Sequence, residues 1–506
     1  MLWTRVSGYD IAVEVLWQVS LDELFKERVS QGVVVTGPER DFTVKALPNG
    51  LKPATRYWFR FLIDGAASPT GRTRTLPSGH VKRLRIAVAS CSNYCFGYFN
   101  AYDAMAKDPD LHFVLHTGDY LYEYGTNEWG DDQGKLLGRA HQPPHEMVSL
   151  ADYRTRHAQY KLDVGAQAMH AAHPCLLVWD DHESANNPWT GGAQNHQPQT
   201  EGEWLKRRAA ALKAWYEWMP VRDPINGEPP ENYWRTFVFG DLATLVCLET
   251  RHTARAEQID YSDHRARIID DSSRDQFLKD VLGAEERPMI SSSMEKVIDS
   301  SLRQSVAQRQ PWRLLGNAIP MGGMSLPDLT SIDFVNNRAD DEDIAELLWK
   351  SRWNLPWYTD TWDGYPRARE RLYQQCAASG ARDMVVLTGD SHSFWFNVLA
   401  DDAGNNMGVE LGTSGITSPG DFLDLGFSTA EAGRLDQHIA EGMPEVHWTD
   451  NLHNGYLQIE ITPENIHASC IALNTICELL FTTAVIKETW ITRSEGTFGT
   501  LQMQLV

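Results

Sequence analysis

The stretch "FVLHTGDYLYE", from Phe113 to Glu123, runs from an apolar segment into Gly-Asp and then into two tyrosines and a glutamate. The stretch "MVVLTGDSHSF", from Met384 to Phe394, repeats the arrangement with a histidine after Gly-Asp. Open α/β sheets bind their ligands beyond the carboxyl ends of the strands. Both stretches therefore predict a buried strand that delivers polar side chains to a ligand site at its end.

The chain around these stretches alternates between strand-like and helix-like segments from Arg83 onward. Apolar strands are expected in "LRIAVASCS", "HPCLLVWDDHE", "LATLVCLETR" and "PWRLLGNAIP", and helices in "FNAYDAMAKDP", "EWLKRRAAALKAWYEWM" and "YPRARERLYQQCAASG". Strand–helix–strand alternation predicts an α/β layer domain. Residues 254–310 are polar and predict loop and helix, and strands are expected again from Gly455 onward.

Residues 1 to about 77 have a different pattern. "DIAVEVLWQVS" and "DFTVKAL" alternate apolar and polar residues, as half-buried strands do, and "SPTGRTRTLPSG" is a Gly/Pro/Thr-rich boundary. We predict a small β-sandwich of fibronectin or immunoglobulin type over residues 1–78. The α/β domain is expected over residues 79–506.

Composition limits the possible partners and compartment. The chain has 506 residues and a net charge of -22, which disfavours wide nucleic-acid or anionic-membrane contacts. A small anionic substrate stays possible, because bound metal cations can invert the potential locally.

The seven cysteines do not suggest a disulfide scaffold, and no apolar run approaches a membrane span of roughly 20 residues. No signal peptide is visible at the start. We expect an exported protein, periplasmic or extracellular, with a cytoplasmic location as the alternative. The sequence gives no indication of the oligomeric state.

Five strand ends carry residues that could bind a metal ion. They are Cys91; Asp119 with Tyr122; Asp180, Asp181, His182 and Glu183, followed by Asn186 and Asn187; Asn317; and Asp390 with His392. A single Gly-Asp is more common as a turn and a lone buried Cys as packing, whereas Asp-Asp-His-Glu after an apolar strand is more specific. Together they predict a shared centre, because an acidic cluster without cations would repel itself. Two neighbouring cations need a bridging carboxylate. We expect Asp119 to be that bridge, because Tyr122 can reach the same ion.

The order of these motifs resembles the PhoD-type alkaline phosphatases, a branch of the calcineurin-like metallophosphoesterases. Cys, Gly-Asp-x-x-Tyr, Asp-Asp-His-Glu, Gly-Asn and Gly-Asp-x-His follow one another as in that family, and "LWTRV", "SPTGRTRTLP", "CLETR", "TWDGYPRARERL" and "GTSGITSPG" agree. The resemblance covers nearly the whole chain. It implies a β-sandwich flanked by helices, preceded by the small all-β domain. The family's usual twin-arginine export signal is missing from this sequence.

The resemblance also implies two metal sites. Ferric iron would bind Cys91, Asp119, Tyr122 and His392. Calcium would bind Asp119, Asp181, Asn317 and Asp390, with Zn²⁺, Mn²⁺ or Co²⁺ as alternative second metals. Phenolate and thiolate suit a hard trivalent ion, and an all-oxygen set suits calcium. Asn187 and Asp180 are weaker candidates for an additional calcium or for support of the ligands.

The expected activity is metal-assisted hydrolysis of a small phosphate ester, a phosphomonoesterase with phosphodiesterase activity. His182 is expected to donate to the phosphoryl group or leaving oxygen; a structural role, holding Glu183 or a backbone carbonyl, is the alternative. Arg251 could bind the phosphate as a fork, or could pair with Glu249 or another neighbour. Asn187 is a further candidate for substrate binding.

Two other functions remain open at this point. The same centre could support phospholipase D-like or phosphotriesterase activity. Alternatively, calcium could only stiffen the loops of a sugar- or surface-binding module. We interpret the tryptophans at 353, 357 and 362 as packing more than as a wall of the site. We expect His141, His145 and His157 on the solvated surface and Cys95 in ordinary packing.

Overall fold

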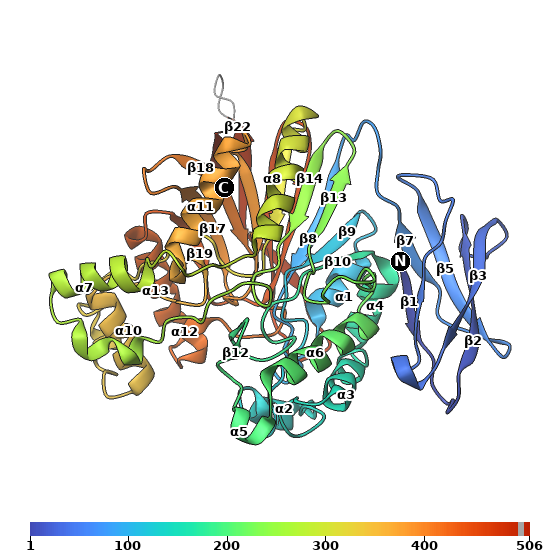
Figure 1. Cartoon of the computed structure of the whole chain (residues 1–506), viewed down its shortest axis with the longest axis horizontal. Coiled ribbons are helices and arrows are strands. Elements are labelled where there is room, and N and C mark those ends of the chain that lie inside the picture. Colours follow the sequence, from blue (N-terminus) through green and yellow to red (C-terminus); the bar gives the residue numbers. More distant parts are fainter. Residues whose placement is uncertain (494–499) are drawn as a thin grey trace.

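The computed structural model describes residues 1–493 and 500–506. Its main body contains two seven-stranded β-sheets (Figure 1). The first sheet, in spatial order, is β10 (Cys175–Leu177), β9 (Phe113–His116), β8 (Leu84–Ala89), β20 (Gly455–Ile461), β21 (Ile466–Leu473), β22 (Thr483–Arg493) and β23 (Leu501–Leu505). Strands β8, β9 and β10 are parallel to one another, and β20 to β23 continue the sheet antiparallel.

The second sheet has a parallel centre and antiparallel edges. In spatial order it is β13 (Arg235–Phe239), β14 (Ala243–Cys247), β15 (Trp312–Gly316), β16 (Met384–Thr388), β18 (Asn406–Gly412), β17 (Phe394–Ala400) and β19 (Val446–Asp450). Strands β14, β15, β16 and β18 are parallel. All residues of β14, β15 and β16 are buried, which explains their continuous apolar sequences.

The two sheets face each other across one continuous apolar core. Ile86 and Leu115 of the first sheet belong to the same buried cluster as Leu245 and Leu315 of the second. The cluster extends to α8 (Ser292–Ala307) and α11 (Pro366–Ala378), which cover the second sheet. Burial of these surfaces, at about 25 cal/mol per Å² of apolar area, is the main force that holds the layers together.

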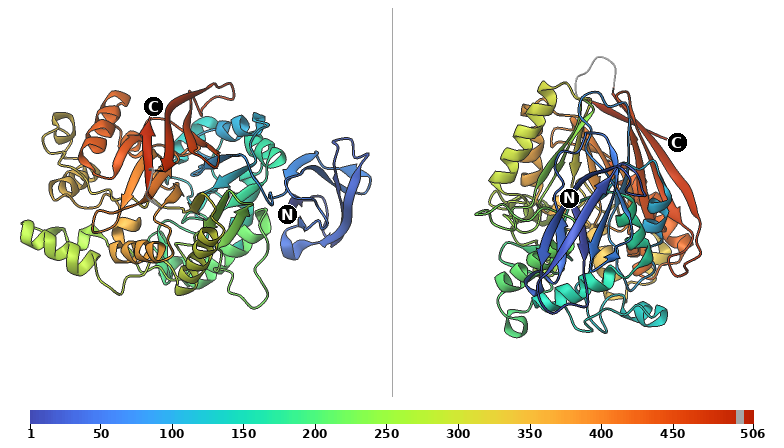
Figure 2. Two further views of the ribbon diagram at one scale, coloured as in Figure 1. Left: turned by 90° about the horizontal axis from the view of Figure 1, so that it is seen from above. Right: turned by 90° about the vertical axis from the view of Figure 1, so that its right-hand side faces the viewer.

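A second apolar cluster joins the first sheet to helices on its other face. Ala87 of β8 and Val114 of β9 pack there against helix residues such as Tyr102 and Trp215. The helices on this side are α1 (Asn100–Lys107), α3 (Leu150–Tyr160), α4 (Val164–Ala172) and α6 (Trp204–Trp218). The predicted sandwich of two sheets with helices on both outer faces is confirmed (Figure 2).

The N-terminal domain consists of strands and lies beside the main body (Figure 2). Its strands are β1 (Leu2–Arg5), β2 (Val13–Ser20), β3 (Arg28–Thr36), β4 (Thr43–Ala46), β5 (Arg56–Ile63), β6 (Ala66–Ala67) and β7 (Gly71–Arg74). Strand β1 pairs with β4, and the order β3-β2-β5-β6 forms the larger sheet, with β7 also paired to β5. The predicted boundary at residue 78 falls between β7 and β8, and the exact domain limits stay a prediction.

Short elements fill the loops that surround the sheet ends. They are α2 (Asp131–Leu137), β11 (Pro188–Trp189), β12 (Gly192–Ala193), α5 (Pro198–Glu201), α7 (Asp271–Phe277), α9 (Asp333–Asn336), α10 (Glu342–Arg352), α12 (Asp421–Asp424) and α13 (Thr429–Gly442). Within the described ranges, no helix combines the length and apolar character that a membrane crossing needs.

Candidate metal centre

The two Gly-Asp pairs lie where neighbouring strand ends touch. A Cβ on Gly118 would lie 2.4 Å from the Cβ of Asp180, and one on Gly389 would lie 2.1 Å from Oγ of Ser90. Both distances are too short for any larger residue. Glycine is therefore needed at the contact, and the aspartate that follows it enters the space between the strands.

Five candidate site residues have a left-handed backbone. The φ angles are 59° at Cys91, 54° at Asp119, 51° at Asn187, 66° at Asp390 and 55° at His392. This conformation costs residues other than glycine roughly 1–2 kcal/mol each, somewhat less for Asn and Asp. Such strain is typically found where the surrounding structure must aim a functional side chain. At Cys91, Asp119, Asp390 and His392 it accompanies side chains whose donor atoms meet in shared groups, whereas the Asn187 amide donates to Gln194.

A first group of donors combines sulfur, oxygen and nitrogen. The Sγ atom of Cys91 lies 3.4 Å from Oδ2 of Asp119. The Tyr122 hydroxyl lies 3.3 Å from the same oxygen and 3.3 Å from Nε2 of His392. Donor atoms of Cys91, Asp119 and His392 all lie within 4.8 Å of one another. These four side chains, predicted as one ligand set, are therefore brought together.

Two further groups are built from carboxylates and share Asp119 with the first. Asp119, Asp180, Asp181 and Asp390 form one, and Asp119, Asp181 and His182 form the other. The donor atoms of each group lie within 4.8 Å of one another. Asp119 is the residue common to all three, which is the position expected of a bridging carboxylate between two cations.

Four oxygens of the centre lack hydrogen-bond partners among the described residues. They are Oδ1 of Asp119, Oδ2 of Asp180, Oδ1 of Asp181 and Oδ1 of Asn317, all buried. An unsatisfied buried polar atom costs about 1–3 kcal/mol, and more when charged. The amide nitrogen of Asn317 donates to the carbonyl of Ile319 at 2.6 Å, which fixes the side chain. These oxygens fit direct coordination of cations.

The carboxylates carry more negative charge than the protein around them neutralises. Burial, followed by the charge of Asp181, raises the pKa of Asp119 well above its ordinary value. Burial, followed by the charge of Asp180, does the same to the pKa of Asp390. The buried Arg251 guanidinium contacts Asp180 at 2.5 Å and Asp390 at 3.3 Å. One guanidinium beside three buried carboxylates and the half-buried Asp390 leaves an excess that metal cations would balance.

His182 is held in a fixed orientation beside this group. Its Nδ1 lies 2.7 Å from Oε2 of Glu123, and its Nε2 lies 3.8 Å from Oδ2 of Asp181. The ring packs on Tyr122 with 4.2 Å between centroids. Burial would lower the pKa of His182, but the charges of Asp181 and Glu123 outweigh it and raise the pKa to about 9. The contact with Glu123 leaves Nε2 as the ring atom that faces the centre.

Residues of the "GTSGITSPG" stretch orient two of the donors. Nδ1 of His392 lies 3.0 Å from the carbonyl of Pro419, which leaves Nε2 as the atom that faces the centre. The Ser418 hydroxyl donates to the Tyr122 oxygen at 2.8 Å. Trp129 stacks on the His392 ring with 5.6 Å between centroids. These contacts fix the rings of the first group.

Two family models match the chain. The one described as PhoD-like phosphatase matches residues 86–470, and the one described as its N-terminal domain matches residues 1–77. The chain belongs to the PhoD-like phosphatase family. It is 32% identical over 484 residues to "Alkaline phosphatase D" of Bacillus subtilis (strain 168), which covers 92% of this chain and 73% of that protein. It matches a solved "Structure of PhoD" with a TM-score of 0.80 and 29% identity over 99% of this chain and 88% of that one. The chain is therefore a phosphoric ester hydrolase, an alkaline phosphatase of the PhoD type.

In this PhoD-like phosphatase, Arg251 and Asn187 contact carboxylates of the centre. The Arg251 guanidinium pairs with Asp180 and Asp390. Its contact with Glu249 is through the backbone N–H of Arg251, which donates to that carboxylate at 2.8 Å. The backbone N–H of Asn187 donates to Oδ2 of Asp181 at 2.9 Å. Both residues thereby position carboxylates of the centre. A direct contact with substrate stays a prediction for each.

Sequence reasoning missed Glu123, Ser418 and Pro419 as supports of the site. Glu123 ends the stretch "GDYLYE", but no spacing rule shows that it meets His182, 59 residues later. Glu183, considered as that partner, instead accepts backbone N–H groups of Asp119, Tyr120 and Asp180.

The expected surface position of three histidines was partly wrong. His141 and His157 are buried, and only His145 is exposed. His141 contacts the Tyr160 hydroxyl at 3.1 Å, and His157 stacks on Trp218. Trp357, Trp362 and Cys95 are buried in packing, in agreement with the interpretation from the sequence.

Proposed function

We propose that this phosphatase hydrolyses phosphate monoesters, and diesters more slowly, at a two-metal centre bridged by Asp119. The membership of Asp119 in all three buried donor groups is the observation that carries the proposal. The net charge of -22 does not oppose an anionic substrate, because cations at the centre would make its local potential positive.

The donor types suggest which ion each side of the bridge would take. Cys91, Tyr122 and His392, with Asp119, form a mixed set that suits ferric iron. Asp181, Asn317 and Asp390, with Asp119, form an all-oxygen set that suits Ca²⁺, whereas Zn²⁺ prefers nitrogen and sulfur. Mn²⁺ or Co²⁺ at the second site are alternatives.

Residues of the chain would supply the proton donor and hold the ligands in position. Bound cations would supply a water of lowered pKa and neutralise charge on the phosphoryl oxygens. Glu123 holds Nδ1 of His182, so Nε2 is the atom that can give a proton to the leaving oxygen. Arg251 holds Asp180 and Asp390 in fixed orientation through its guanidinium. The strained strand ends keep these groups aligned before substrate arrives.

The substrate class is tested with three compounds: an aryl monophosphate, a bis-aryl phosphate and a choline phospholipid. We expect the monoester to react fastest, the diester measurably and the phospholipid not at all, with all activity lost on chelation. A preference for the phospholipid, or for a phosphate triester added to the panel, would favour the alternative hydrolases. Loss of thermal stability on chelation, with no ester hydrolysed before it, would favour a binding module.

A tyrosinate–iron absorption band tests the first ligand set. We expect the metal-loaded enzyme to show a visible band that Tyr122→Phe removes, because the phenylalanine lacks the phenolate oxygen. Tyr124→Phe is the matched control, since the Tyr124 ring lies 6.4 Å from that of Tyr122 but is not among the predicted ligands. Absorption is compared with iron content by elemental analysis. Full activity with iron bound and no such band would remove Tyr122 from the ligands.

A further inference from the structure

A large cavity separates the N-terminal domain from the main body. Its volume is about 1500 Å³, and residues of β5 and β7 form one wall while His112, α4 and β10 form the other. None of the candidate metal ligands lines it. The volume exceeds the 300–1,000 Å³ typical of ligand sites. The cavity is therefore separate from the candidate metal centre.

The charge of this lining is opposite to that of the whole chain. Six arginines and two lysines line the cavity, and Asp110 is the single acidic residue among its described lining residues. The chain itself carries a net charge of -22. A basic hollow with low-dielectric walls focuses its potential and attracts anions.

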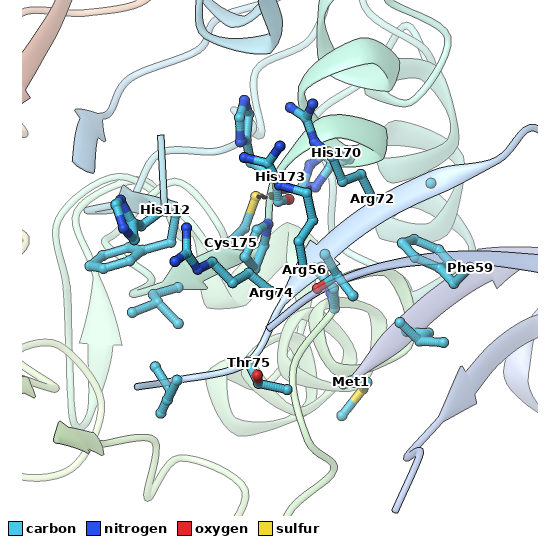
Figure 3. Close-up of a pocket in the computed structure, with 18 of the residues that line it drawn as sticks. Met1, Arg56, Phe59, Arg72, Arg74, Thr75, His112, His170, His173 and Cys175 are labelled. Atoms are coloured by element: carbon cyan, nitrogen blue, oxygen red, sulfur yellow. Dashed lines mark hydrogen bonds between the residues drawn. The ribbon is translucent and has the colours of Figure 1, made fainter. Parts of the chain in front are cut away.

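Three of these arginines are forced together by strand pairing. Arg56 of β5 lies directly opposite Arg74 of the antiparallel β7, and Arg72 shares the face of Arg74 because it is two residues away. Figure 3 shows Arg56, Arg72 and Arg74 extending toward the wall that carries His112, His170 and His173. Like charges directly opposite each other on neighbouring strands destabilise a sheet.

No carboxylate forms an ion pair with these arginines within the described part of the chain. Arg56 donates to the carbonyl of Pro109 at 2.8 Å and Arg72 to that of Ala172 at 3.0 Å, and the ion pairs of the described residues include none from Arg56, Arg72 or Arg74. Burial, followed by the charge of Arg56, lowers the pKa of Arg72 and of Arg74. Among the described residues the three cations therefore have no ion-paired counter-charge, and only the more distant Glu23 acts favourably on Arg72.

The opposite wall offers neutral hydrogen-bonding groups. Burial, followed by the charge of Arg74, lowers the pKa of His112 to about 4, and burial followed by the charge of Arg72 lowers that of His173 to about 4. Both rings are therefore uncharged near neutral pH and add no repulsion. An anion between the walls would meet guanidinium forks on one side and imidazole groups on the other.

We propose that this interdomain cavity binds a phosphate-type oxyanion through Arg56, Arg72 and Arg74, separately from the metal centre. Tetrahedral oxyanions match the forked donors of arginine. The anion would neutralise the facing arginines of β5 and β7 and tie the N-terminal domain to the main body. Its source is either free inorganic phosphate, the product of the reaction, or a phosphate group carried on a larger ester.

Equilibrium dialysis of the metal-loaded enzyme with labelled inorganic phosphate tests the proposal. We expect two phosphates per chain in the wild type, one at the metal centre and one in the cavity. Arg74→Gln should weaken the second by tenfold or more while the rate on an aryl phosphate stays within twofold. Arg28→Gln, an exposed arginine on β3, is the matched control and should keep both sites. The absence from the wild type of any bound phosphate that Arg74→Gln weakens would overturn the proposal.

Thermal stability provides a second test, because Arg74→Gln should act in opposite directions on the melting temperature in chloride and on its rise with phosphate. In chloride buffer Arg74→Gln should be at least as stable as the wild type, because the repulsion with Arg56 is gone. Added phosphate should then raise the wild-type midpoint by a few degrees more than that of the variant. Arg56→Gln should behave alike and serves if Arg74→Gln does not fold. Equal phosphate shifts in wild type and both variants would contradict the site.

Phenylphosphonate distinguishes the two sources of the anion. Phenylphosphonate carries its anionic group on an organic residue. If it displaces the labelled phosphate from the cavity site, the one that Arg74→Gln weakens, the cavity accepts a phosphate group carried on a larger molecule. Retention of that label would identify inorganic phosphate itself. Failure of catalysis in the wild type would instead concern the metal centre, so the two proposals can fail independently.

Discussion

Asp119→Asn is expected to lower the rate of phosphate-ester hydrolysis by about 10³-fold or more. An amide has a single acceptor oxygen and a nitrogen that only donates, so it cannot bridge two cations. Loss of one metal removes several kcal/mol of charge stabilisation, and each 1.4 kcal/mol is a factor of ten in rate. Initial rates on an aryl monophosphate, with metal content measured on the same samples, check this expectation.

The same substitution has a second effect, on stability, that excludes misfolding as the cause. In the metal-free protein it removes one of several carboxylates that repel one another, so Asp119→Asn should be at least as stable as the wild type. With metals added, the wild type should gain stability by ligand binding and the variant should gain much less. Thermal unfolding with and without chelator measures both.

Asp132→Asn is the matched control for this prediction. The Asp132 side chain is fully exposed and its closest charged contact is Lys135, at 3.6 Å. It should change neither rate nor metal content. If Asp119→Asn kept its activity within about threefold of the wild type, the bridge would be wrong and the three donor groups would need another shared residue.

The strand ends were predictable because they combine apolar runs with abrupt polar endings. A chain that buries "MVVLT" in a sheet must end the strand before Asp390, and parallel strands bring such endings to one edge. The sequence could therefore place Cys91, Asp119 and Asn317 near one another. It could not show the left-handed backbone at Cys91 or Asp119, because that conformation follows from the contacts around each turn.

Partners far apart in the sequence escaped prediction. Arg251 meets Asp180 across 71 residues, and the spacing of neither residue indicates the other. Its forked guanidinium suggested a phosphate, but within the folded chain the nearest anions are carboxylates. The interdomain cavity was also out of reach, since "GRTR" shows two arginines on one strand face but not that Arg56 lies opposite Arg74.

His182→Ala is expected to lower the hydrolysis rate of an alkyl phosphate by roughly 10²-fold or more, the usual contribution of a general acid. The loss should be much smaller for a nitrophenyl phosphate, because a nitrophenolate leaves without a proton. In the variant, Oε1 of Glu123 keeps the N–H of Asn186, at 2.6 Å, and the amide of Asn195, at 2.9 Å, whereas Oε2 loses its contact with His182. None of these residues is a predicted metal ligand. The metal ligands should therefore stay in place, which metal analysis checks.

Glu123→Gln separates the proton donor from the residue that positions it. Glutamine keeps the shape beside Nδ1 but removes the charge that favours the protonated ring, so we expect a smaller loss with the same dependence on the leaving group. His145→Ala, at an exposed ring, should leave all rates unchanged. A loss under fivefold in His182→Ala, or an equal loss for alkyl and nitrophenyl esters, would assign His182 a structural role, because a proton donor must matter most where the leaving oxygen is most basic.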